Sequence, residues 1–154
     1  MRVTAWLVSI LVLFATPLRA DNYGAGEEDE SISEGVRMAH SLMAKSDWAG
    51  AVPLLEAHMS GHYDDDETMA DLGYAYWHIG EKELAVTTLR SALWINPHNL
   101  EASLYLGEVS LEFGNLAEAQ HRLEILDGIC FFGCAEYWTL KRLMAETRKQ
   151  ASEH

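Results

Sequence analysis

Small and apolar residues recur at intervals of 34 along this chain. The repeating sets are Ala51, Ala85 and Ala119; Leu55, Leu89 and Leu123; and Met38, Leu72, Leu106 and Leu140. A period of this length is typical of two-helix units that stack side by side. Each unit is too small to bury its own apolar stripe, so it packs against the next unit. The period therefore predicts an all-α solenoid with an extended concave surface, suited to holding another molecule.

The first twenty residues have the pattern of a secretory signal peptide. Arg2 precedes an apolar run over residues 5–14, and residues 17–20 end in the small residue Ala20. The apolar run is shorter than the roughly 20 residues that a membrane-spanning helix needs. We therefore expect cleavage after Ala20 and export to the periplasm or secretion, with no membrane span in what remains. An uncleaved anchor is the alternative.

Removal of this segment leaves residues 21–154, a length that suits one domain. Residues 21–30 contain two glycines and a block of four acids, and they have little to bury, so we expect a disordered acidic linker. The folded domain is then expected at 31–154. The exported chain has 24 carboxylates and only nine Lys or Arg, a net charge of about −15. Because such a chain repels phosphates, no nucleic-acid partner is expected.

Helical periodicity begins near Ser31 and continues to the C-terminus. The expected helices cover residues 31–45, 48–59, 66–78, 82–95, 100–112, 116–126 and 135–151. They form three hairpins and one extra helix, whose polar outer face caps the array. Asp47 is placed to cap the second helix, and Gly80 and Gly114 fall between the helices of a hairpin. Pro53 predicts a kink or a late start in the second helix.

The unit over residues 66–99 has the clearest repeat signature. Its small and apolar positions are Leu72, Gly73, Tyr76, Gly80, Ala85, Leu89, Ala92 and Pro97. This pattern resembles the tetratricopeptide repeat (TPR), with Met69 in place of the first consensus tryptophan. The unit over 100–133 keeps most of the pattern without the closing proline, and the unit over 32–65 keeps little of it. The resemblance implies a TPR-like α-α superhelix of three helical hairpins plus a C-terminal capping helix.

In TPR proteins, the first helix of each hairpin lines a concave groove that binds a protein or peptide. Carried onto this chain, the resemblance implies a polar and aromatic partner-binding groove beside the apolar Met43 and Leu104. Its residues are Arg37, His40, Asp71, Tyr74, Trp77, His78, Tyr105, Glu108, Glu112, Trp138 and Arg142. Tyr and Trp give large contact areas with a polar tip and dominate binding energies at interfaces. The alternative is that Trp77 and Trp138 fill space between helices.

Cys130 and Cys134 are the only cysteines, and both lie in the exported part of the chain. Disulfides persist outside the cytoplasm, and an even number of closely spaced cysteines predicts one bond between these two. The bond would fix the turn that precedes the last helix. Redox catalysis is a poorer interpretation, because the usual dithiol motif has two intervening residues rather than three. Copper(I) binding by the two thiolates is a further alternative.

His58 and His62 are four positions apart and are followed by three aspartates at 64–66, a spacing that suits metal ligands. Gly61 separates the histidines and is expected to end the helix, so we expect a solvated loop, with Asp65 or Asp66 capping the next helix. We predict no metal site. The sequence also shows no nucleophile motif and no glycine-rich phosphate loop. It therefore predicts neither an enzyme nor a cofactor.

We expect an exported protein–protein interaction adaptor or assembly factor that binds its partner in the groove. The acidic and aromatic groove favours a partner with Lys or Arg and an apolar anchor. One alternative is a permanent structural or accessory subunit of a larger cell-envelope complex, docked through the array ends or the convex face. Another is a thiol- or copper-handling maturation factor that uses Cys130 and Cys134.

Overall fold

The computed structural model describes residues 27–153. Its helices are α1 (Glu27–Met43), α2 (Trp48–Met59), α3 (Asp66–His78), α4 (Lys82–Ile95), α5 (Leu100–Glu112), α6 (Leu116–Ile129) and α7 (Ala135–Ser152). Helices α2 to α5 have the predicted bounds. Helix α1 covers 27–43 instead of 31–45, and α6 and α7 end later than predicted, at Ile129 and Ser152. The predicted signal peptide, 1–20, and residues 21–26 of the predicted linker lie outside the described residues. Within 27–153, no helix is long and apolar enough to cross a membrane.

Short polar side chains start four of these helices by accepting a hydrogen bond from a backbone N–H in the first turn. The pairs are Asp47 with Gly50 at 3.0 Å, Asp65 with Thr68 at 3.0 Å, Asn99 with Ala102 at 2.7 Å and Asn115 with Glu118 at 3.2 Å. The turns inside the second and third hairpins use Gly80 and Gly114, whose φ angles are 88° and 70°. Such positive φ angles favour glycine. These caps and turns set the helix boundaries that the sequence predicts.

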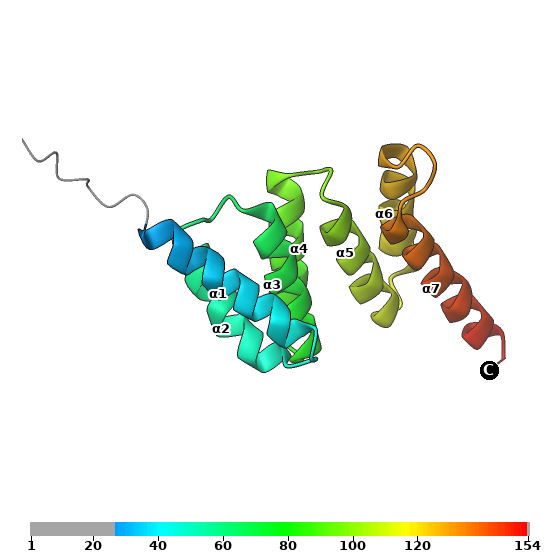
Figure 1. The fold of residues 1–154 in the computed structure, drawn as a ribbon. Helices are drawn as coiled ribbons and strands as arrows, with labels where there is room; N and C mark the ends of the chain where they lie inside the picture. The colour runs from blue at the N-terminus through cyan, green and yellow to red at the C-terminus, as the bar shows by residue number, and fades with distance from the viewer. Residues whose placement is uncertain (1–26, 154) are drawn as a thin grey trace, which may run out of the picture.

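The helices are arranged side by side in chain order as three hairpins and a final single helix (Figure 1). The hairpins are α1–α2, α3–α4 and α5–α6, and each following helix packs against the hairpin before it. From the second unit onwards, the first helices of neighbouring units also touch. Helix α3 contacts α5, and α5 contacts α7. This all-α arrangement confirms the predicted solenoid of three hairpins plus a terminal helix.

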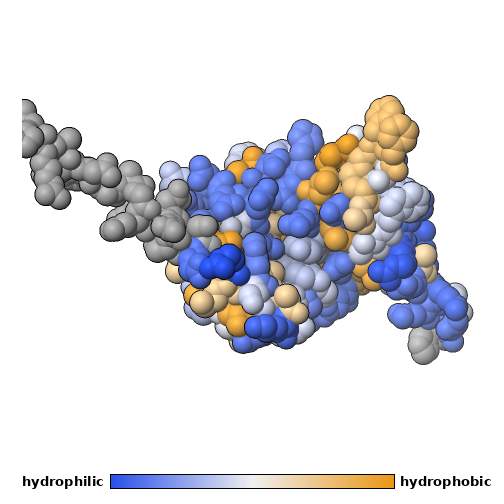
Figure 2. All heavy atoms as spheres, viewed as in Figure 1, coloured by the Kyte–Doolittle hydropathy of each residue, from blue (hydrophilic) through white to orange (hydrophobic). Residues whose placement is uncertain are grey.

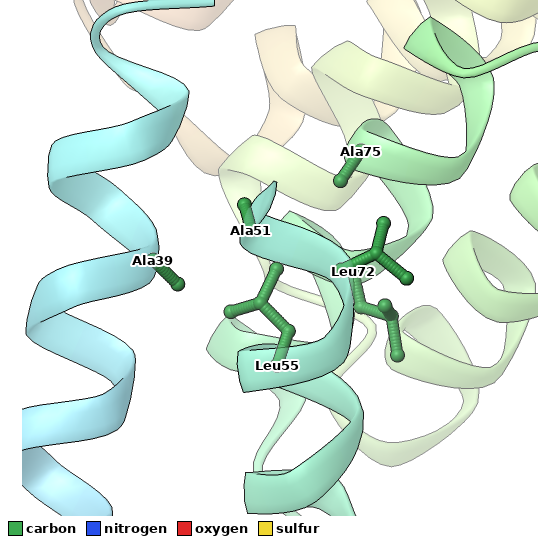
Figure 3. Close-up of a cluster of buried hydrophobic side chains, with 6 residues drawn as sticks. Ala39, Ala51, Leu55, Leu72 and Ala75 are labelled. Atoms are coloured by element: carbon green, nitrogen blue, oxygen red, sulfur yellow. The ribbon is translucent and has the colours of Figure 1, made fainter. Parts of the chain in front are cut away.

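Three successive apolar clusters form the core, and each joins one hairpin to the next helix. The first contains Ala39 of α1, Ala51 and Leu55 of α2, and Leu72 and Ala75 of α3 (Figure 3). The second joins α3, α4 and α5, and the third is centred on α6 and α7. Because each cluster crosses a repeat boundary, no hairpin buries its apolar stripe alone.

The large apolar residues of the 34-residue period differ in burial between the first unit and the later ones. Leu72, Leu106 and Leu140 are at most 6% exposed, whereas Met38, at the equivalent position of the first unit, is 52% exposed. No helix among the described residues packs in front of α1, so this side of α1 has no neighbour to cover it. In the first unit the neighbouring Ala39, which is fully buried, faces the core instead.

Helix α2 runs from Trp48 to Met59 with Pro53 inside it. The alternative of a late start at this proline is therefore wrong. The Pro53 ring is exposed, so the carbonyl of Ala49, which loses its helical N–H partner, lies on the solvent side of the helix. Water can hydrogen-bond to a carbonyl there, which explains why the helix continues through the proline.

Candidate functional site

The first helices of the units, α1, α3 and α5, are joined on one face by a row of polar and aromatic contacts, which we call the groove face. His40 Nε2 lies 2.6 Å from Asp71 Oδ2 and links α1 to α3. The Tyr74 hydroxyl donates to Glu108 Oε2 at 3.2 Å, and Trp77 Nε1 donates to Glu112 Oε2 at 2.5 Å. The last two bonds both link α3 to α5.

Tyr74 is the centre of an aromatic cluster on this face. Its ring stacks on Tyr105 of α5, with centroids 3.9 Å apart and planes inclined by 15°. It also meets His78 edge to face at 4.6 Å, and His78 in turn stacks on Trp48 of α2 at 3.9 Å. Tyr74, Trp77 and Tyr105 are all partly exposed. The rings therefore pack neighbouring units together and still present a surface to solvent.

Not every predicted groove residue joins this network. Arg37 pairs with Glu34 one turn earlier on α1, and Arg142 pairs with Glu146 one turn later on α7 at 3.2 Å. Trp138 is 55% exposed and lies against Gly133 and Tyr137, in the segment that leads from the disulfide into α7. The hydrogen bonds, ion pairs and ring contacts of these three residues stay within their own unit, although the charge of Arg142 also acts on Glu108 of α5. The predicted residues that connect units are His40, Asp71, Tyr74, Trp77, His78, Tyr105, Glu108 and Glu112.

Burial gives the carboxylates of the groove face an unusual electrostatic state. It raises the pKa of Asp71, although the hydrogen bond and the charge of His40 act in the opposite direction. Burial also raises the pKa of Glu108, against the hydrogen bond from Tyr74 and the charge of Arg142. Desolvation of a carboxylate disfavours its charged form, and a bound cation would restore the lost stabilisation.

The structure adds Glu101 to this acidic surface, a residue that sequence reasoning missed. Its pKa is raised by burial and by the carboxylates of Asp71, Glu136 and Glu67. Glu101 lines a hollow of about 390 Å³ at the N-terminal ends of α3, α5 and α7, together with Glu67 and Glu136. Glu67 and Glu101 are 34 residues apart, so the repeat period is the signal that would have found them.

A second, smaller hollow lies towards the C-terminal ends of the same helices. It has a volume of about 190 Å³ and is lined by Trp77 of α3, Glu108 and Leu111 of α5, and Leu143 and Thr147 of α7. Leu111 was also missed, although it follows Trp77 by one repeat period. The groove face thus has an acidic hollow at one end and a mainly apolar hollow towards the other.

Two other predictions concern side chains away from this face. Cys130 and Cys134 form the predicted disulfide, with an S–S distance of 2.16 Å. His58 and His62 stack with centroids 4.4 Å apart, and His58 Nε2 bonds to Asp65 Oδ2 at 2.8 Å. Burial raises the pKa of Asp65, but hydrogen bonds from Thr68 and His58 outweigh it and hold that pKa below its usual value. Of the two predicted candidates, Asp65 and Asp66, it is Asp65 that caps α3, by accepting the hydrogen bond from the Thr68 N–H.

The surface outside the groove face has its own exposed apolar side chains. Phe131 and Phe132 are 90% and 92% exposed and contact each other edge to face, with centroids 5.4 Å apart. They lie inside the disulfide loop between α6 and α7. A hydrophobic projection stands over this connection in Figure 2, on a face that is otherwise largely hydrophilic. Trp94 on α4 is 88% exposed as well.

Comparison with known proteins finds the fold but no related sequence family. No family model matches the chain, and no curated protein sequence matches it. Among solved structures, the Yersinia enterocolitica type III secretion translocator chaperone SycD is similar, with a TM-score of 0.68 and 14% identity over 80% of this chain and 88% of SycD.

Two further structures have the same fold. SycD in complex with a peptide of the translocator YopD has a TM-score of 0.66 and 15% identity, over 81% of this chain and 96% of that one. MamA has a TM-score of 0.61 and 17% identity, over 83% of this chain and 84% of MamA. The chain therefore has the TPR-like helical fold of SycD and MamA.

Proposed function

We propose that this protein is an exported adaptor or assembly factor that binds a protein or peptide partner on its groove face. The observation that carries the proposal is the partly exposed aromatic cluster of Tyr74, Tyr105 and Trp77, bordered by the carboxylates of Asp71 and Glu108. Rings held in place by neighbouring units lose little conformational freedom on binding, which favours affinity. Cationic and apolar side chains of a partner match this surface.

The fold supports the same proposal. SycD, which has the same fold, has a solved complex with a peptide of the translocator YopD. The groove face of this chain carries contacts and hollows but no arrangement of nucleophile and base, so we propose binding and not catalysis. We propose export on the basis of the signal-like residues 1–20. Mass spectrometry of the exported protein is expected to find Asp21 as its first residue, and a retained Met1 would contradict cleavage.

Affinity capture in the native cells tests the proposal. We expect a tagged protein to retain a specific partner that the double variant Tyr74→Ala/Trp77→Ala loses, while its circular dichroism stays helical. The matched control is Trp94→Ala, which removes an exposed tryptophan on α4, outside the groove face. If the double variant captures the same partner as fully as the unaltered protein does, the groove face is not the binding site.

The exposed Phe131, Phe132 and Trp94 favour a second candidate, a permanent subunit of a larger cell-envelope complex. Large apolar side chains that are almost fully exposed favour a permanent interface with another protein. Size-exclusion chromatography separates the two functions, because an adaptor is expected to be a stable, soluble small species alone and a permanent subunit to aggregate. A copper-handling function requires both thiols free, so copper titration of the reduced protein, with and without Cys130→Ser, tests that alternative.

A further inference from the structure

The two hollows of the groove face differ in the charges that line them. The acidic hollow is lined by the carboxylates of Asp66, Glu67, Glu101 and Glu136 and by His98, and by no Lys or Arg. Two cations lie towards the other end, where Lys82 Nζ is 3.7 Å from Glu112 and the charge of Arg142 lowers the pKa of Glu108 against the effect of burial. Arg37 of α1 pairs with Glu34 on its own helix. The acidic hollow therefore lacks the Lys and Arg side chains that lie beside the carboxylates at the other end.

The carboxylates that line the acidic hollow, Asp66 among them, are not all engaged in the same way. Asp66 accepts hydrogen bonds from Asn96 at 2.9 Å and Asn99 at 2.7 Å. Asp71 and Glu108 likewise have partners. Within residues 34–153, by contrast, no side chain hydrogen-bonds or ion-pairs with the three glutamates of the hollow. A Lys or Arg side chain that enters the hollow would meet three carboxylates that are not already paired with another donor in this part of the chain. No existing hydrogen bond would have to break for it to bind.

The apolar hollow suits a side chain of the opposite kind. Trp77, Leu111 and Leu143 supply its apolar wall, and its volume of about 190 Å³ is large enough for one aliphatic or aromatic side chain. The wall is already ordered, because the Trp77 indole is fixed by its hydrogen bond to Glu112. Burying an apolar side chain there removes its surface from water and favours binding.

Helix α5 supplies residues to both hollows, so its geometry sets the distance between them. Glu101 lines the acidic hollow, and Glu108 and Leu111 line the apolar one. At 1.5 Å per residue, these positions are separated by about 10–15 Å along the helix axis. An extended chain advances about 3.3 Å per residue, so three to five residues cover this distance. Between the hollows lie the stacked rings of Tyr74 and Tyr105.

We infer that the groove face recognises an extended segment with two anchors, a Lys or Arg in the acidic hollow and an apolar side chain in the apolar hollow, three to five positions apart. The segment runs along the axes of α3 and α5 and crosses the Tyr74–Tyr105 stack. This inference rests on the proposed function and adds to it the partner's sequence pattern. It also fixes which end of the groove face takes which anchor.

Selection from a random dodecapeptide library displayed on phage tests the pattern. The exported chain, with its disulfide intact, is expected to enrich peptides that carry a basic and an apolar residue at this spacing. Selection on Glu101→Gln is expected to weaken the basic preference and keep the apolar one. Selection on Thr147→Phe, which fills the apolar hollow, is expected to do the reverse. Asp127→Asn, an exposed acid on α6, is the control and leaves both preferences unchanged.

One enriched peptide then gives the magnitudes by fluorescence polarisation. Glu101→Gln is expected to weaken binding about three- to fivefold, as for a partly exposed ion pair. Leu143→Ala removes part of the hollow's apolar wall, and Thr147→Phe fills the hollow, so both are expected to weaken binding. If only Leu143→Ala does so, a filled hollow still permits binding and the hollow is not the anchor site. Peptides that bind through Tyr74 and Trp77 without the spaced pair overturn the inference and leave the proposed function standing. Failure to enrich any peptide, or enrichment unaffected by Tyr74→Ala/Trp77→Ala, contradicts both.

Discussion

The hydroxyl of Tyr74 donates a hydrogen bond to the carboxylate of Glu108, one repeat period further along the chain, at 3.2 Å. The bond connects the first helices of two successive units. Because the pKa of the Tyr74 hydroxyl is raised, by burial and by Glu108, the hydroxyl keeps its proton and remains a donor at neutral pH. A side chain that faces the proposed partner thus also holds two repeats together.

Tyr74→Phe separates these two roles. The ring and its stack on Tyr105 stay, but the partly buried Glu108 carboxylate loses its donor, so we expect a loss of stability of about 1 kcal/mol. Urea unfolding followed by circular dichroism measures it. Tyr63→Phe, in the exposed loop before α3, serves as the control because Tyr63 is 77% exposed. Equal stability of the two variants would show that the inter-repeat bond contributes nothing.

Gly73→Ala tests the close contact inside the second hairpin. A Cβ atom at Gly73 would lie 2.7 Å from Leu89 Cγ and 3.1 Å from the Leu89 backbone nitrogen. Because Leu89 is fully buried, it has no room to move, and we expect a loss of about 1–3 kcal/mol in urea unfolding. Gly35→Ala in α1 meets no atom within 4 Å and is expected to be neutral or stabilising. A neutral Gly73→Ala would contradict this packing.

The pH dependence of stability reports on Glu101. Its raised pKa means that the folded protein binds the proton more tightly than the unfolded chain does, so ionisation of Glu101 opposes folding. The penalty is absent below the ordinary carboxyl pKa and complete at neutral pH. Glu101→Gln is therefore expected to raise the melting temperature at pH 7, and the gain is expected to vanish below about pH 4. Glu124→Gln on α6 is the control, and a gain independent of pH would contradict the assignment.

The disulfide is expected to contribute little to global stability. It joins residues only four positions apart, so the entropy it removes from the unfolded chain corresponds to at most about 2 kcal/mol. Comparison of the unaltered protein with Cys130→Ser/Cys134→Ser in urea unfolding measures this loss. A much larger loss, or loss of α6 and α7 by circular dichroism, would show that the bond determines the fold of the last repeat.

The sequence predicted the fold well because two independent signals agreed. The period of 34 fixed the stacking of the units, and Asp47, Gly80 and Gly114 fixed the helix boundaries. It failed at two points where the repeat pattern alone was not sufficient. Met38 was aligned with buried leucines but is exposed, because the position needs a preceding helix to cover it. The end of α6 was placed too early, since the helix continues through Gly128 to Ile129.

The repeat positions predicted most of the residues that join units on the groove face, but they also included Arg37, Trp138 and Arg142 and missed Glu101 and Leu111. The contacts among these residues were not predicted. The sequence does not show that Tyr74 stacks on Tyr105, or that His78 stacks on Trp48 of the preceding helix, because these contacts depend on the angle between units. The two hollows depend on the same angle. They involve Glu136 and Leu143 of α7, neither of which the repeat positions single out.

Site-specific photo-crosslinking in the native cells tests the central claim that the groove face holds the partner. A benzoylphenylalanine is placed in turn at Glu101 and Leu111, which line the two hollows, and at Trp94, on the exposed side of α4. We predict that positions 101 and 111 crosslink to the same partner and that position 94 does not. Crosslinks to that partner from position 94 alone, with none from the groove face, would contradict the account.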